Sequence, residues 1–135
     1  MTDSENERIQ TAKRWLQSLL RGTPDSALII PNFEYEQHYG FTAGLYIGEE
    51  GLERWLETFY EVWDRASVDF SEDVREVANR IALDARIHAQ ARQSGIEVEL
   101  RVTGVYEFAR DGRLTRVDAF NDGSAAAEWL AQERG

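Results

Sequence analysis

Cysteine is absent from this chain of 135 residues, histidine occurs only twice and lysine once. Without thiols the chain has no disulfide, no thiolate nucleophile and no cysteine-ligated zinc or iron–sulfur site. His38 and His88 lie far apart in the sequence, and two histidines alone do not make a metal site. Lys13 lies outside any glycine-rich loop, so the Walker pattern of nucleotide-binding proteins is missing. We therefore expect neither a metal ion nor another cofactor.

Long hydrophobic runs and an excess of basic residues are also missing. No stretch approaches the ~18 apolar residues of a membrane span, and the N-terminal segment is acidic and polar, unlike a secretory signal. The 25 acidic residues outnumber the 15 basic ones, and the formal net charge of −10 repels nucleic acids and anionic membranes. We expect a cytoplasmic protein that binds neither nucleic acid nor membrane.

The composition is that of a folded globular chain, with 42% hydrophobic residues, 30% charged residues and only 2 prolines. A chain of this length is close to one typical domain and buries about two thirds of its unfolded surface. We predict a single domain over residues 1–135.

The sequence predicts four helices. The first is a helix over 4–21 that begins at a Ser-x-x-Glu capping box. A short helix is expected over 25–30, ended by Pro31. An alanine-rich segment, 124–132, predicts a closing helix that packs on a sheet. The apolar face of a long amphipathic helix consists of Leu52, Trp55, Leu56, Phe59 and Trp63.

Alternation of apolar and polar residues predicts strands in the rest of the chain. The first strand covers 32–39, and the glycine-rich stretch 40–48 after it has the character of a loop. Four more strands, separated by hairpin-type turns, follow the long helix: 68–77, 80–93, 95–110 and 113–121. Helices first and an antiparallel meander afterwards is typical of an α+β fold.

Four short motifs carry a family resemblance: YIGEEGL at 46–52, SGIEV at 94–98, FARDGRL at 108–114 and FND at 120–122. The first resembles the "YRGREGI" entry to the third helix of the nuclear transport factor 2-like superfamily, and FARDGRL resembles its "F-x-x-x-G-K-I" hairpin. The other two are similar to segments of SnoaL-like members. The resemblance implies a cone-shaped, cystatin-like α+β fold, in which a curved antiparallel sheet wraps around N-terminal helices. These motifs are structural, so they indicate the fold rather than the reaction.

The resemblance also implies a deep, mostly apolar pocket at the open end of the cone. By register, the oxyanion-hole aspartate and tyrosine of ketosteroid isomerase correspond to Gly104 and Trp15, and its catalytic base falls near Tyr35. The last-strand aspartate of SnoaL-like polyketide cyclases and limonene epoxide hydrolases corresponds to Ala119. None of these acid/base groups is retained, and isomerisation needs an ionised base and acidic donors around the ketone.

We expect the pocket instead to hold a small, flat or polycyclic apolar ligand. Gly104 and Ala119 are small at positions expected to face inward, which leaves space beside the aromatic side chains. Tyr35, Gln37 and Tyr39 share one face of the first strand and offer hydroxyl and amide groups. The predicted ligand-binding residues are Trp15, Tyr35, Gln37, Tyr39, Trp55, Phe59, Trp63, Val102, Gly104, Tyr106, Val117, Ala119 and Asn121.

Three polar residues are predicted to face away from this pocket. His38 lies on the strand face opposite Tyr35, where pairing with a carboxylate is expected. Asp118 also faces outward unless a bulge shifts the register of the last strand. His88 is expected on the convex sheet surface, through which the resemblance implies a homodimer.

Three kinds of function remain open at this stage. The one we favour is binding of a small molecule. The alternative is an enzyme of the isomerase, polyketide cyclase or epoxide hydrolase type with acid/base chemistry in the same pocket, for which Asp118 and His38 are the catalytic candidates. The third is an interaction module whose pocket is filled by its own side chains. A cavity on the order of 300–1,000 Å³ would distinguish a ligand site from a filled module.

Overall fold

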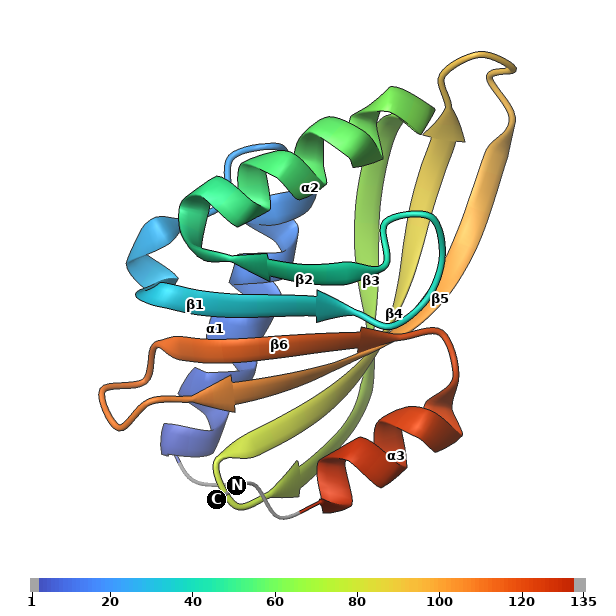
Figure 1. Ribbon diagram of the computed structural model, residues 1–135. Coiled ribbons are helices and arrows are strands. Elements are labelled where there is room, and N and C mark those ends of the chain that lie inside the picture. The colour runs from blue at the N-terminus through green and yellow to red at the C-terminus, as the bar shows by residue number, and fades with distance from the viewer. Residues whose placement is uncertain (1–2, 133–135) are drawn as a thin grey trace.

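The computed structural model describes residues 3–132 and places three α-helices around a six-stranded sheet (Figure 1). The predicted helix–strand order is observed, and the α+β class is confirmed. In chain order the elements are α1 (Asp3–Leu20), the 3₁₀ helix η1 (Ser26–Leu28), β1 (Ile29–Gln37), β2 (Gly44–Ile47), α2 (Gly48–Val62), β3 (Trp63–Val77), β4 (Arg80–Ala91), β5 (Glu97–Phe108), β6 (Leu114–Phe120) and α3 (Gly123–Ala131).

The sheet is curved and not closed, with the strand order β2-β1-β6-β5-β4-β3. Four of its five neighbouring pairs are antiparallel, and three of these four form the predicted meander β3 to β6. The pair β1–β6 is parallel, so the sheet is mixed rather than purely antiparallel. Parallel neighbours cannot be joined by a hairpin, and here β2, α2 and the strands β3 to β5 lie between β1 and β6 in the chain.

Helices cover both faces of the sheet (Figure 1). On the concave face, α1 and α2 contribute Trp15, Leu19 and Leu52 to the larger hydrophobic core. On the convex face, α3 buries Ala126 and Leu130 in a smaller core. Helix α2 contacts β2 and β1 near one edge of the sheet and β3 at the other edge, so it spans the open end of the cone. Within the described residues, no helix has the length and apolarity needed to cross a membrane.

The predicted short helix over 25–30 is wrong in extent. Only η1 is helical there, and β1 begins at Ile29 and runs through Pro31. The pairing of β1 with β6 is irregular between Ile29 and Glu34. Proline lacks an N–H group, so this irregular part of the strand accommodates Pro31 without loss of a ladder hydrogen bond.

Two boundaries around α2 also differ from the prediction. Part of the predicted loop 40–48 forms β2, which pairs with β1. Trp63 is the first residue of β3 rather than the last apolar position of the helix. Its N–H still bonds to the carbonyl of Phe59, but its φ of −109° and ψ of 132° are extended. The chain therefore passes from α2 into β3 without a loop.

Candidate functional site

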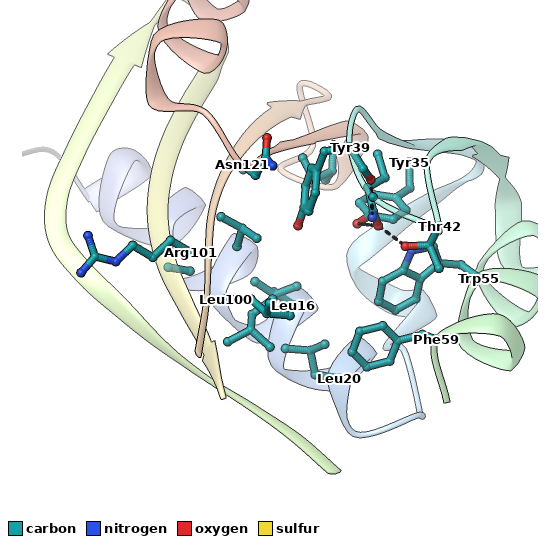
Figure 2. A pocket seen from close by; sticks show the side chains of 18 of the residues that line it. Leu16, Leu20, Tyr35, Tyr39, Thr42, Trp55, Phe59, Leu100, Arg101 and Asn121 are labelled. Atoms are coloured by element: carbon teal, nitrogen blue, oxygen red, sulfur yellow. Dashed lines mark hydrogen bonds between the residues drawn. The ribbon is translucent and has the colours of Figure 1, made fainter. Parts of the chain in front are cut away.

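A cavity of about 420 Å³ lies between α1, α2 and the concave face of the sheet (Figure 2). Leu16 and Leu20 of α1, Phe59 of α2 and Leu100 of β5 form much of its apolar wall. Trp55 of α2 stacks on Phe59, with ring centroids 4.7 Å apart and planes inclined by 16°. The cavity therefore has flat aromatic walls on the side of α2 and aliphatic walls on the side of α1.

All thirteen residues predicted as ligand-binding residues lie on the wall of this cavity. They come from α1, β1, α2, β3, β5 and β6 and from the segments after β1 and β6. Strand pairing aligns them in rows, because Tyr35 is opposite Val117 and Gln37 is opposite Ala119 in the β1–β6 pair. In the β5–β6 pair, Ala119 is opposite Gly104. The alternation of side chains along each strand had placed these residues on one face.

Sequence reasoning missed several other lining residues. Leu16 and Leu20 lie on the same apolar face of α1 as Trp15, so helical spacing could have included them. Ala85 and Ile87 of β4 belong to the predicted inward face of that strand, and the pairing of β4 with β5 places Ala85 opposite Val102 and Ile87 opposite Leu100. Phe41 and Thr42 come from the loop between β1 and β2, which has no periodic signal.

A hydrogen-bond network fixes the amide of Gln37 in the cavity wall. Its Oε1 accepts from the Tyr35 hydroxyl at 3.2 Å and from Trp55 Nε1 at 2.8 Å. Its Nε2 donates to the backbone oxygen of Tyr39 at 2.8 Å. Since the oxygen already has two donors, the amide presents its second N–H as the free polar group.

Burial raises the pKa of the tyrosines around the cavity. The pKa of Tyr39 rises to about 12 through desolvation, and desolvation also raises the pKa of Tyr106 above its ordinary value. The pKa of Tyr35 is well above its ordinary value because of burial first and then because of the neighbouring Tyr39, Tyr106 and Tyr46 hydroxyls and Asp118. All three cavity phenols are therefore neutral at physiological pH.

The predicted space beside Gly104 is not open. A Cβ atom at this position would lie 2.7 Å from Cε1 and 2.8 Å from the hydroxyl of Tyr106. The ring of Tyr106, two residues along the same strand, folds back over the glycine and fills that space. Ala119 does border the cavity and is 8% exposed.

Two ionised side chains occur among the described lining residues, Glu99 and Arg101, and both are exposed. Glu99 faces Arg86 at 4.0 Å. Arg101 extends away from the cavity in Figure 2. The interior surface is therefore formed by apolar side chains and by neutral hydroxyl and amide groups.

A family model described as a SnoaL-like domain matches residues 12–117, which include the second half of α1, all of α2 and most of the strands around the cavity. The chain belongs to the SnoaL-like domain family. No curated protein matches the sequence significantly.

Solved structures share the fold of this SnoaL-like domain at low sequence identity. An NTF2-like protein of unknown function from Burkholderia pseudomallei is 14% identical, with a TM-score of 0.70 over 93% of this chain and 98% of that chain. TerC, co-crystallised with polyporic acid, is 18% identical, with a TM-score of 0.69 over 96% and 100%. A hypothetical protein with a ketosteroid isomerase-like fold from Catenulispora acidiphila, in complex with trimethylamine, is 10% identical, with a TM-score of 0.67 over 82% and 84%. These similarities confirm the nuclear transport factor 2-like fold.

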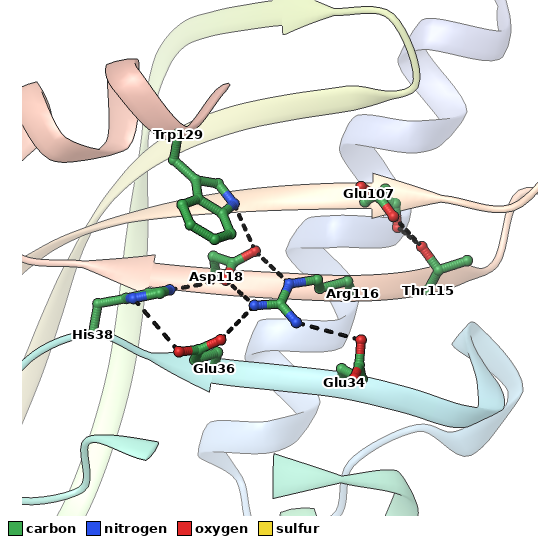
Figure 3. Close-up of polar contacts among 8 residues, drawn as sticks. All are labelled: Glu34, Glu36, His38, Glu107, Thr115, Arg116, Asp118 and Trp129. Atoms are coloured by element: carbon green, nitrogen blue, oxygen red, sulfur yellow. Dashed lines mark hydrogen bonds and ion pairs between the residues drawn. The ribbon is translucent and has the colours of Figure 1, made fainter. Parts of the chain in front are cut away.

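The two catalytic candidates lie on the face of the sheet opposite the cavity of the SnoaL-like domain (Figure 3). The Asp118 carboxylate accepts hydrogen bonds from Arg116 Nε at 3.0 Å and Nη2 at 2.8 Å, and from Trp129 Nε1 at 2.9 Å. Nε2 of His38 lies 2.9 Å from the same carboxylate. The outward direction of Asp118 is as predicted, but α3 covers the site, and the Asp118 side chain is only 3% exposed.

The same network includes two further carboxylates and one positive charge. Arg116 bonds to Glu34 at 3.3 Å and to Glu36. Potential ligand atoms of Glu36, His38 and Asp118 lie within 4.8 Å of one another, a spacing that suits a metal ion. The Arg116 guanidinium, however, already binds the carboxylates of Glu36 and Asp118. This arrangement is that of an ion-pair network, because a cation between these groups would face the fixed positive charge of Arg116.

Proposed function

We propose that this SnoaL-like domain binds a small, flat, apolar molecule in its cavity. The observation that carries the proposal is the cavity of about 420 Å³ with aromatic walls. Ligand sites have volumes of roughly 300–1,000 Å³ and are lined mostly by hydrophobic and aromatic side chains with few polar groups. This volume favours a ligand site over a module filled by its own side chains.

The polarity of the wall supports binding over acid/base catalysis. A general acid or base must lie within hydrogen-bond reach of the reacting atom. His38 and Asp118 lie on the other face of the sheet, and Arg101 points away from the cavity. Gly104 and Trp15, where the resemblance would require acidic donors, have no acidic hydrogen.

Two structural neighbours support a small-molecule role for this fold. TerC was co-crystallised with polyporic acid, and the protein from Catenulispora acidiphila is in complex with trimethylamine. At identities of 18% and 10% the chemistry of those ligands does not transfer to this chain. The aromatic wall itself is the reason to expect a flat apolar ligand here.

The direct test is calorimetric titration of fluorene, a flat tricyclic hydrocarbon, with the protein and with Ala119→Leu. Leucine at this position adds three heavy atoms where Ala119 borders the cavity, so we expect binding to weaken at least about tenfold. Ala127→Leu is the matched control, because Ala127 is exposed on α3 and does not line the cavity. Absence of fluorene binding to the wild type, or equal binding by Ala119→Leu, would contradict the proposed function.

We also propose that two copies of the domain associate through the convex face of the sheet. Arg86 and His88 are exposed on β4, and His88 Nε2 lies 2.9 Å from Asp69 of β3. Asp69 of β3 is opposite Arg86 of β4, so this face carries both signs of charge, and a second copy can pair with it in a complementary way. Sedimentation over a concentration series tests the association, and a monomer at every concentration would contradict it. The cytoplasmic location and the single domain over residues 1–135 stay predictions.

A further inference from the structure

Two tyrosine hydroxyls at the cavity have no hydrogen-bond partner within residues 3–132. They belong to Tyr39 and Tyr106, and both side chains line the cavity. The chain has five tyrosines, and the hydroxyls of the other three donate to Gln37 Oε1 and to the backbone oxygens of Thr42 and Leu20. Because both side chains line the cavity, these two hydroxyls are free to bond to a molecule that occupies it.

The position of the Tyr106 hydroxyl depends on Gly104. The ring of Tyr106 lies so close to this glycine that a Cβ atom would come within 2.8 Å of the hydroxyl oxygen. The hydroxyl therefore lies over the β5 backbone, at the point where Gly104 is paired with Ala119 of β6. The Tyr106 ring is also held by an edge contact with Trp15, with centroids 6.4 Å apart and planes at 78°. The hydroxyl is thus fixed on the inward face of the sheet by packing, without help from a hydrogen bond.

The Tyr39 hydroxyl reaches the same cavity from the segment after β1. Figure 2 shows its oxygen directed into the space between Asn121 and Leu100. Desolvation raises the pKa of Tyr39 to about 12 and raises that of Tyr106 as well. Both hydroxyls therefore keep their protons and act as neutral donors at physiological pH.

Trp15 also lines the cavity, but its indole N–H is fully buried. Within the described residues, the indole nitrogen of Trp15 is the one buried side-chain polar atom without a hydrogen-bond partner. An indole N–H only donates, so the packing around the Tyr106 ring contains a further donor without a protein acceptor. Among the described lining residues, Arg101 is the one cationic side chain, and it extends away from the cavity. A ligand carboxylate would therefore find no positive charge to pair with inside the cavity.

We propose that the cavity selects a neutral aromatic ligand bearing a carbonyl oxygen, which accepts a hydrogen bond from Tyr106, with Tyr39 as a second donor. This inference depends on the proposed function, namely that the cavity binds a flat apolar molecule. A hydrocarbon that fills the cavity displaces water from the two hydroxyls and leaves them unpaired, whereas a carbonyl oxygen restores a bond. An unpaired buried hydroxyl costs about 1–3 kcal/mol, which corresponds to a selectivity of about tenfold or more.

The test uses two probes of nearly the same shape, 9-fluorenone and fluorene, which differ by one carbonyl group. Their dissociation constants are measured by calorimetry for the wild type, Tyr106→Phe and Tyr39→Phe. We expect Tyr106→Phe to lower the preference for fluorenone over fluorene about tenfold, and Tyr39→Phe to lower it by a smaller factor. Tyr60→Phe is the matched control, because the Tyr60 hydroxyl bonds to the backbone of Leu20 and Tyr60 does not line the cavity.

A second readout reports the hydrogen bond itself. The carbonyl stretching band of bound fluorenone is expected at lower frequency in the wild type than in Tyr106→Phe, since a donor weakens the C=O bond. If fluorene binds but the preference and the band are the same in the wild type and Tyr106→Phe, the carbonyl inference is wrong and the proposed function stands. If neither probe binds the wild type, the proposed function fails and the inference fails with it.

Discussion

Replacing Asp118 by alanine tests whether the network under α3 stabilises the fold. The Asp118 side chain is 3% exposed, and its carboxylate accepts two hydrogen bonds from Arg116 and one from Trp129. Its removal leaves the guanidinium of Arg116, 10% exposed, with only Glu34 and Glu36 as acidic partners. Breaking a buried ion pair by removing one partner costs about 3–5 kcal/mol. Because two carboxylates remain, we expect about 3 kcal/mol.

The loss is measured by urea unfolding followed through tryptophan emission, with Trp129 as a reporter inside the network. For a chain of this size about 3 kcal/mol corresponds to a melting temperature lower by roughly 10 °C. Asp118→Asn keeps the shape but loses the charge, so we expect a smaller loss of about 2 kcal/mol. Glu34→Ala is the control, because the Glu34 side chain is 39% exposed and such pairs contribute roughly 0–1 kcal/mol.

Two results would refute this reasoning. A loss below about 1 kcal/mol in Asp118→Ala would mean that the buried network does not stabilise the fold. Loss of fluorene binding by the folded Asp118→Asn protein would contradict the position of Asp118 on the face opposite the cavity. We expect its affinity for fluorene to equal that of the wild type.

Further predictions concern pH, backbone and activity. The pKa of Tyr39 is about 12 in the folded protein, whereas an unfolded tyrosine titrates at about 10, so the unfolded chain loses this proton at lower pH. The urea midpoint should therefore fall as the pH rises from about 10 to 12. In the folded protein, the ultraviolet absorbance of the Tyr39 phenolate should appear only near the upper end of this range. Gly104→Ala should cost about 1–3 kcal/mol in urea unfolding, because its methyl group meets a tyrosine ring at 2.7 Å. Gly48→Ala, at φ +65°, should cost about 1–2 kcal/mol, whereas Gly123→Ala, with nothing within 4 Å, should change stability by less than about 0.5 kcal/mol. An ultraviolet assay should detect no appreciable isomerisation of a Δ5-3-ketosteroid, because the base candidates His38 and Asp118 lie on the other face of the sheet and Trp15 and Gly104 replace the donors of the isomerase. A rate within about tenfold of ketosteroid isomerase would overturn the register used here.

Local patterns in the sequence were sufficient to predict the inward face of the sheet. Side chains alternate along any strand, so Tyr35 and Gln37, or Val117 and Ala119, share a face whatever the neighbouring strands are. Helical spacing likewise placed Trp15 on the buried face of α1. These residues all line the cavity in the structure. Their roles as ligand contacts stay a proposal.

Irregular backbone could not be predicted from the same patterns. Proline ends most helices and interrupts most strands, so Pro31 favoured a break after a short helix. Its place inside β1 is acceptable only because the pairing with β6 is irregular there, and that pairing joins segments far apart in the sequence. The direct passage from α2 to β3 at Trp63 depends in the same way on where β3 meets β4.

The sequence by itself determined the fold class, the order of all elements except β2, and the side of the sheet on which the residues of the predicted strands lie. Only the tertiary structure decided what surrounds those residues. Asp118 faces outward as its alternation requires, yet α3 returns over it and His38 reaches it from 80 positions earlier through the parallel β1–β6 pair. The absence of a side chain at Gly104 predicted open space on the inward face of the sheet, yet the ring of Tyr106 fills that space. Alternation along a strand fixes only direction, whereas the neighbours in that direction depend on strand pairing and side-chain packing between distant segments.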